Sequence, residues 1–327
     1  MINCIRKISI AALTAVGLLG FVLGICLTLP TPSQASSSPP PSPSIVAPAI
    51  SYTVFLPIIS KPQPSASPDW LATVNFYRSL ANLPDVTENS SYSDGAWKHA
   101  RYMVKNDFIG HTEDPGNPWY TPEGLKAAQS SNLAVFSNIN TTDEAAVAAW
   151  MDGPFHALGV LDPALKQVGF GSYRENIGLY RVGAALNVIQ GLGSIPSGTK
   201  FPIFFPADGT KTPLSTFTGE SPSPLSSCPG YSTPTGPNII LQIGDGSRTP
   251  NTTAHSFLEN GVPKPHCIFD ETTYHHNDSS SQSLGRNILN SRDAVVVMPR
   301  YPLKPGAIYS VSITVNGQTY TWSFEAL

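Results

Sequence analysis

The chain has 327 residues, which by typical domain sizes corresponds to two folded domains plus segments without a fold of their own. Only 13% of the residues are charged and 32 are proline, so the composition favours an exported protein rich in β-structure and coil over a helical cytosolic enzyme. A formal net charge of -3 leaves no basic surface for nucleic acid, and that class of partner is excluded.

The first 35 residues have the three parts of a secretory signal peptide. Arg6 and Lys7 form a basic start, an apolar run covers residues 8–29, and Ser33-Gln34-Ala35 is a small-x-small cleavage site. The sequence therefore predicts a signal peptide over residues 1–35 and a secreted or cell-surface location. The apolar run is also long enough to anchor the chain in a membrane if it stays uncleaved.

A segment rich in Ser and Pro follows the predicted signal peptide. Residues 36–68 are predicted to be a disordered spacer, because such a composition buries too little apolar surface to offset the entropy of ordering. An apolar stretch at residues 52–59 interrupts the spacer and is interpreted as a strand that docks on a folded domain.

Residues 69–193 are predicted to form the first folded domain. Apolar residues recur at helical spacing in its first half, and Thr141-Thr142-Asp143-Glu144 supplies an N-cap and an acidic first turn for a further helix. We expect helices near residues 70–80, 96–104 and 143–152, and strands near residues 167–173 and 184–189.

Two histidines of this domain lie in distinctive phrases. His111 lies in Asn106-Asp107-Phe108-Ile109-Gly110-His111-Thr112, and His156 ends the phrase Trp150-Met151-Asp152-Gly153-Pro154-Phe155-His156. The supporting phrases are Val74-Asn75-Phe76-Tyr77-Arg78, His99-Ala100-Arg101-Tyr102-Met103-Val104 and Val168-Gly169-Phe170-Gly171. In order and spacing the phrases resemble the CAP superfamily (cysteine-rich secretory proteins, antigen 5 and pathogenesis-related proteins) and its bacterial SCP-like relatives. The resemblance covers roughly residues 70–193 and implies a three-layer α-β-α sandwich.

The resemblance also implies a cavity lined by two histidines and two acidic residues, which are residue types that suit zinc. His111 and His156 match the two histidines. The Glu-Asn-Ile phrase that usually carries one acid in bacterial members is matched here with Ser137-Asn138-Ile139, so the glutamate is replaced by a serine. Two histidines alone hold zinc weakly, because a catalytic zinc site generally has three protein ligands and a water.

Three acidic residues are candidates for the missing ligand. Asp152, at the end of the third helix, is the best placed, and Glu113 and Asp114 are the alternatives. We expect no required cofactor. The only cofactor that these residues allow is zinc or another divalent cation, bound weakly. The competing interpretation is a vestigial cavity in which the histidines bond to each other or to the backbone.

Aromatic residues lie in the sequence between the second and third helices. Trp119 and Tyr120 are candidates for a cavity rim together with Ser137 and Asn138, since ligand pockets combine aromatic walls with few polar groups; a packed turn is the alternative for the aromatic pair. His99 is interpreted as a packing or capping histidine.

Residues 198–327 are predicted to form an all-β immunoglobulin-like sandwich. Its last hairpin turns at Asn316-Gly317, and a two-residue type I′ turn pairs Ile313 with Tyr320, Val311 with Trp322 and Tyr309 with Phe324. Signal-peptide cleavage leaves Cys228 and Cys267, which we expect to pair in a disulfide worth about 4 kcal/mol in the chain-entropy model.

The sequence supports one leading function and two alternatives. The leading prediction is a non-enzymatic extracellular or cell-surface binding module, with lipids, sterols or cell-wall components as the ligand classes that the family resemblance implies. The first alternative is a metal-dependent hydrolase that uses His111 and His156. The second is an adhesive or spacer protein whose cavity is empty.

Overall fold

The computed structural model describes residues 69–327. The predicted signal peptide, the spacer and the apolar stretch at residues 52–59 therefore lie outside the described residues. Within residues 69–327, no helix is long and apolar enough to cross a membrane.

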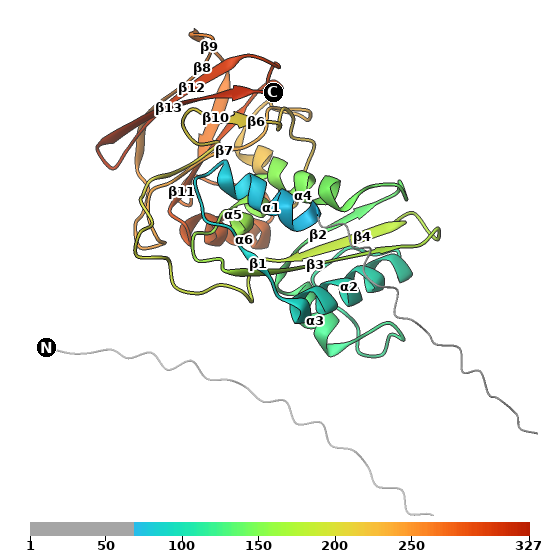
Figure 1. The fold of residues 1–327 in the computed structure, drawn as a ribbon. Helices are drawn as coiled ribbons and strands as arrows, with labels where there is room; N and C mark the ends of the chain where they lie inside the picture. Colours follow the sequence, from blue (N-terminus) through green and yellow to red (C-terminus); the bar gives the residue numbers. More distant parts are fainter. Residues whose placement is uncertain (1–68) are drawn as a thin grey trace, which may run out of the picture. The chain divides into compact units, whose positions relative to one another are not determined.

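The N-terminal region (residues 69–193) has a sheet between two layers of helices, as the sequence predicts (Figure 1). The sheet order is β1-β3-β4-β2; β1 is parallel to β3, and the other neighbours are antiparallel. The strands are β1 (Thr87–Glu88), β2 (Ser131–Phe136), β3 (Gln167–Arg174) and β4 (Val182–Asn187). Helices α2 (Ser90–Lys105) and α3 (Pro122–Ala128) lie on one side of the sheet; on the other lie α1 (Asp69–Ser79), α4 (Asp143–Asp152) and α5 (Pro154–Val160).

Local sequence signals explain the positions of these elements. The Thr142 side chain accepts a hydrogen bond from the backbone N–H of Ala145, so the predicted cap of α4 is confirmed. Helix α2 packs directly on β3 because Gly171 has no side chain. A Cβ atom added there would lie 2.1 Å from the backbone nitrogen of Trp97, so only glycine allows this approach.

The C-terminal region (residues 198–327) contains two sheets that share a hydrophobic core. One has the order β10-β11-β7-β5 and the other the order β6-β13-β12-β8-β9. The first four are β5 (Ile203–Phe205), β7 (Ile239–Gln242), β10 (His266–Phe269) and β11 (Ala294–Pro299). The other five are β6 (Lys211–Thr212), β8 (Thr252–Glu259), β9 (Val262–Pro263), β12 (Ile308–Val315) and β13 (Gln318–Ala326). Side chains from β7 and β11 pack against β8, β12 and β13.

The predicted hairpin is confirmed in its register. Ile313 pairs with Tyr320, Val311 with Trp322 and Tyr309 with Phe324. Asn316 and Gly317 both have positive φ angles, of 51° and 78°, as a type I′ turn requires. The alternation of apolar and hydroxyl residues, together with the turn chemistry, was therefore enough to determine this pairing.

The prediction that the C-terminal region is all-β is wrong. Helix α6 (Ser279–Asn290) lies within it, capped by Asp278, and a short 3-10 helix, η1, covers Pro224–Ser227. The predicted disulfide between Cys228 and Cys267 is confirmed, with the two Cα atoms 5.6 Å apart. It links the end of η1 to β10.

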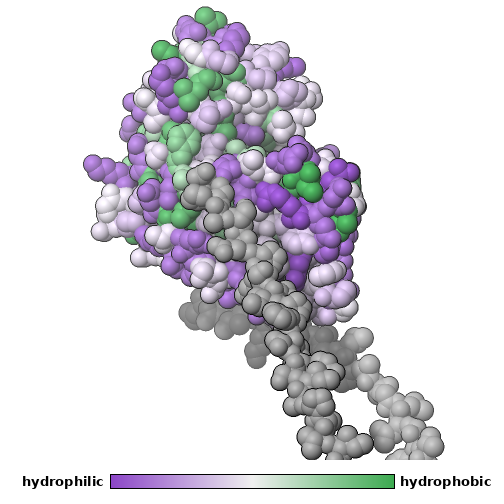
Figure 2. Space-filling model, turned by 45° about the vertical axis from the view of Figure 1, so that its right-hand side comes forward, coloured by the Kyte–Doolittle hydropathy of each residue, from purple (hydrophilic) through white to green (hydrophobic). Residues whose placement is uncertain are grey.

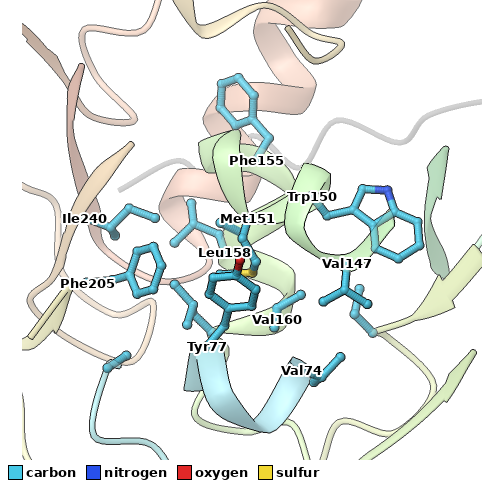
Figure 3. Close-up of a cluster of buried hydrophobic side chains, with 14 of the residues drawn as sticks. Val74, Tyr77, Val147, Trp150, Met151, Phe155, Leu158, Val160, Phe205 and Ile240 are labelled. Atoms are coloured by element: carbon cyan, nitrogen blue, oxygen red, sulfur yellow. The ribbon is translucent and has the colours of Figure 1, made fainter. Parts of the chain in front are cut away.

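One hydrophobic core extends across the boundary predicted between residues 193 and 198. Side chains of α1, α4 and α5 meet Phe205 of β5 and Ile240 of β7, as Figure 3 shows. The Phe155 ring lies 5.0 Å from the ring of Tyr274, which precedes α6. The two regions therefore bury apolar surface against each other.

Candidate functional site

His111 lies on the loop after α2, at the C-terminal end of α3. Its Nδ1 atom is 2.7 Å from the carbonyl oxygen of Ala128, the last residue of α3. The residue is exposed, but the protein around its ring displaces enough water to lower the pKa of His111. The bond to Ala128 acts against this shift, and His156 and His99 add to it. The neutral ring is therefore favoured at neutral pH.

A buried pair holds the loop that carries His111. His99 Nδ1 lies 2.9 Å from Glu113 Oε1, and both side chains are fully buried. His99 Nε2 lies 3.0 Å from the carbonyl oxygen of Gly110, the residue before His111. The second Glu113 oxygen accepts from the backbone N–H of Thr121. Glu113 is thus fixed beneath the loop by these contacts.

His156 lies in the first turn of α5 and is held by a residue from the C-terminal region. Its Nδ1 atom is 2.6 Å from Glu220 Oε2, and the Glu220 side chain is only 4% exposed. The same carboxylate accepts from the backbone N–H groups of Phe155 and His156, both at 3.2 Å. Because Gly153 supplies no side-chain cap, Glu220 satisfies the exposed donors of this helix start. A Cβ atom at Gly153 would lie 2.4 Å from Glu220 Cδ, so glycine allows the carboxylate to approach.

Asp152 lies beside this arrangement. Burial raises its pKa to about 7, and the negative charge of Glu220 adds to the shift. Burial also raises the pKa of Tyr77 to about 12, with the charge of Asp152 as the second cause. Asp152 therefore loses its proton near neutral pH and not at the acidic pH usual for an aspartate.

Both histidines line two adjoining cavities, of about 420 Å³ and about 520 Å³. The residues common to both are His111, His156, Ser221, Pro222 and Leu284. The smaller cavity runs toward α6 and is also lined by Ser131, Asn132, Phe155, Ile189, Ile288 and Arg292. The larger runs along β2 and α4, past Ile109, Leu133, Phe136 and Trp150. We call the two together the histidine pocket.

The histidine pocket brings together some of the predicted site residues and not others. Ser137 and Asn138 are exposed beyond the end of β2 and line neither cavity; the serines that share a cavity with both histidines include Ser131, at the start of β2, and Ser221. Asn132 follows it, and its side-chain amide donates to the carbonyl oxygen of His156.

Trp119 and Tyr120 also lie apart from the pocket lining. The Trp119 ring packs against α2, with Lys105 Nζ 4.7 Å and Arg101 Cζ 5.3 Å from its centre. The Trp119 ring thus contacts two cationic side chains of α2.

The histidine pocket does not fit a catalytic zinc ion. No group of three or more His, Cys, Asp or Glu residues in the described part of the chain could hold a metal. His111 and His156 each use Nδ1 for a protein hydrogen bond, which leaves one nitrogen, Nε2, on each ring as a possible ligand, and Asp152 lines neither cavity. Two imidazoles without a third ligand fall short of the usual donor set.

Sequence reasoning missed Glu220, Ser131 and the pocket residues of α6. Glu220 follows Thr-Gly in a segment rich in Ser and Pro, where no periodicity or spacing marks it. The apolar side chains of α6 gave a weak signal, since Leu284, Ile288 and Leu289 follow helical spacing after a good cap at Asp278.

Comparisons with known proteins agree with the motifs. The model of the cysteine-rich secretory protein family (CAP) matches residues 71–187.

An extracellular protein containing an SCP domain from Bacillus anthracis str. Ames is 17% identical over 39% of this chain and 40% of that chain, with a TM-score of 0.29. The match thus spans less than half of that protein. An outer surface protein from Borrelia burgdorferi is 21% identical over 36% of this chain and 86% of that chain, with a TM-score of 0.26. No curated protein matches the chain. Residues 71–187, both pocket histidines among them, therefore match the CAP family that the sequence motifs resemble.

Proposed function

We propose that the protein is exported and acts outside the cell, or on its surface, as a binding module for an amphipathic lipid in the histidine pocket. The observation that carries the proposal is the lining of the pocket. Two histidines share it with apolar side chains that face open space, including Leu284 at 51% exposure, Ile189 at 53% and Ile109 at 44%. Pockets of this size that combine apolar and aromatic side chains with convergent polar groups are typical of small-molecule sites.

The exposed apolar residues of the pocket favour ligand binding. A half-exposed Leu or Ile side chain gains free energy when a ligand covers it, at roughly 25 cal/mol per Å² of apolar surface removed from water. On the face drawn in Figure 2, hydrophobic residues occur as separate patches among hydrophilic ones. In the pocket itself, the exposed side chains of Leu284, Ile189 and Ile109 give a ligand its apolar contacts.

The predicted metal-dependent hydrolase finds less support. It requires a metal held firmly enough to activate water, and the pocket offers two imidazole nitrogens without a third protein ligand among the described residues. The adhesive or spacer function predicts no ligand in the pocket, so a titration with a labelled acyl chain distinguishes it from the lipid-binding function.

The immunoglobulin-like character of the C-terminal region is also a proposal. It is supported by the core that the two sheets share and by the antiparallel hairpin of β12 and β13. In this interpretation α6 is an addition that forms one wall of the histidine pocket.

The experiment is a titration with a dansyl-labelled acyl chain in the presence of EDTA. We expect the wild type to bind the probe and Leu284→Asp to weaken binding about tenfold, because the carboxylate places a charge against the acyl chain. Leu179→Asp is the matched control, since Leu179 is 61% exposed and lines neither cavity. Equal affinities in wild type and Leu284→Asp, or no binding by the wild type, would contradict the proposal.

A further inference from the structure

The hydrogen bonds behind the two pocket histidines determine which ring nitrogen carries a proton. The partner of His111 Nδ1 is the carbonyl oxygen of Ala128, at 2.7 Å. A carbonyl oxygen only accepts hydrogen bonds, so Nδ1 must be the protonated nitrogen of His111. In the neutral ring Nε2 is then an unprotonated acceptor, free of the Ala128 contact.

The protonated nitrogen of His156 is also Nδ1, because its hydrogen-bond partner is a carboxylate. Its Nδ1 atom faces the Glu220 carboxylate at 2.6 Å, and an ionised carboxylate only accepts. Glu220 also accepts two backbone N–H groups at the start of α5, so its position is fixed by three bonds. The neutral form of His156 therefore also presents Nε2 as an acceptor.

A third polar group of the pocket has no partner in the protein. Ser131 is 6% exposed, and its Oγ atom forms no hydrogen bond to any described residue. A buried hydroxyl without a partner is costly, and such groups in native proteins usually have a role or a bound partner. Ser131 lines the same cavity as His111 and His156.

The charges around the pocket are already neutralised within the protein. Arg292 lines the smaller cavity and is paired with Asp162 at 2.8 Å. Glu220 lines the larger cavity and is bonded to His156. The one unpartnered donor of these two side chains within the described residues, Arg292 Nε, is fully buried. A charged ligand head would therefore find no free counter-ion at the pocket surface.

We propose that the histidine pocket selects an amphiphile whose uncharged head carries hydroxyl groups. The hydroxyls donate to Nε2 of His111 and His156, and the Ser131 hydroxyl joins them, while the acyl chain lies against the apolar residues of α6. A carboxylate head is disfavoured because its oxygen lone pairs would face the imidazole lone pairs. This inference rests on the proposed lipid-binding function and names the class of its ligand.

Three probes with the same acyl chain test the inference: monodecanoylglycerol, methyl decanoate and decanoate. Calorimetric titration at pH 8 with EDTA should show monodecanoylglycerol binding about 25-fold more tightly than methyl decanoate, since its hydroxyls form one hydrogen bond to each histidine and each bond contributes about fivefold. His111→Phe keeps the aromatic surface and removes the acceptor, so the preference should fall to about fivefold or less. His275→Phe is the control, because the His275 ring is exposed and forms no hydrogen bond within the described residues.

The outcomes separate this inference from the function on which it rests. If the three probes bind equally, or decanoate binds most tightly, the inference on the head group is overturned and the lipid-binding function stands. If no probe binds, both fail. Should His111→Phe not fold, ¹⁵N spectra of the wild-type histidine rings at pH 8 decide the matter. They should show His111 protonated at Nδ1, with the Nε2 signal shifting when monodecanoylglycerol is added; protonation at Nε2 would overturn the inference.

Discussion

The two regions of the molecule contribute different things to the histidine pocket. The N-terminal region supplies the polar groups His111, Ser131 and His156, and both histidines lie in distinctive sequence motifs. The C-terminal region supplies Glu220 and Leu284 from segments without a motif. The chemistry of the site is thus recognisable from one region, while its geometry and much of its apolar wall depend on the other.

This division bears on what the C-terminal region does. If the C-terminal region were a separate module, changes in it would not affect the fold of residues 71–187, which match the CAP family. Instead Glu220 satisfies the helix start that carries His156, and the large hydrophobic core contains residues of both regions. We therefore expect changes in the C-terminal region to alter the stability of the N-terminal region.

The largest effect is expected from loss of the disulfide. Cys228→Ser with Cys267→Ser opens a loop with a sequence separation of 39 residues, which should cost about 4 kcal/mol of unfolding free energy. Because Cys228 belongs to the shared core, both regions should lose stability together. Denaturation followed by fluorescence should show a single transition, since four of the five tryptophans precede residue 151 and report on the N-terminal region. Two separate transitions, with the tryptophan signal unshifted, would mean that the regions fold independently.

The next effect concerns the residue that joins the regions at the site. Glu220→Ala removes the acceptor of two backbone N–H groups and of the His156 ring, and should cost about 3 kcal/mol. For a chain of this size the melting temperature should fall by roughly 6–12 °C. Glu123→Ala is the matched control, because its side chain is 57% exposed in a surface ion pair with Lys98, and such pairs contribute little to stability. Similar shifts in both variants would show that Glu220 has no special role.

The same contrast explains how far the sequence could be interpreted. The β12–β13 hairpin and the disulfide were predictable because each depends on local signals: alternation around an Asn-Gly turn, and two remaining cysteines. The match of residues 71–187 to the CAP family followed from phrases at fixed spacing. In each case the information lies within a short stretch or in a count.

The arrangement of the site could not be derived in this way. Ser137-Asn138-Ile139 was matched to the family phrase by its residue types alone. Which residue of β2 lies near the histidines depends instead on how β2 pairs with β4, and this pairing places Ser131 opposite Asn187. Glu220 reaches His156 across 64 residues of chain, and no periodic pattern encodes that contact. Helix α6 was missed because its capping signal lies among polar residues that also suit a loop.

A smaller effect is expected at Asp152, where the regions meet electrostatically. Its pKa in the folded protein is raised to about 7, so the ionised carboxylate destabilises the fold. The stability that the protonated form provides is fully present below the unfolded pKa near 4 and is lost as the pH rises through 7. Asp152→Asn should therefore raise the unfolding free energy at pH 8 by about 2 kcal/mol, allowing for partial exposure, and change it little at pH 4. Urea denaturation at the two pH values measures this. A variant less stable than wild type at pH 8 would mean that the charge of Asp152 is stabilising.

The smallest effect is expected at Trp119, within the N-terminal region alone. Its ring contacts Arg101 and Lys105 on α2 and lines neither cavity, so Trp119→Ala should cost about 1 kcal/mol of stability from lost cation–π contacts. Binding of the dansyl-labelled acyl chain should change less than about twofold, in contrast to Leu284→Asp in the C-terminal region. If Trp119→Ala instead weakened the probe as strongly as Leu284→Asp, the ligand would extend over α2, and the N-terminal region would form a binding surface without help from α6.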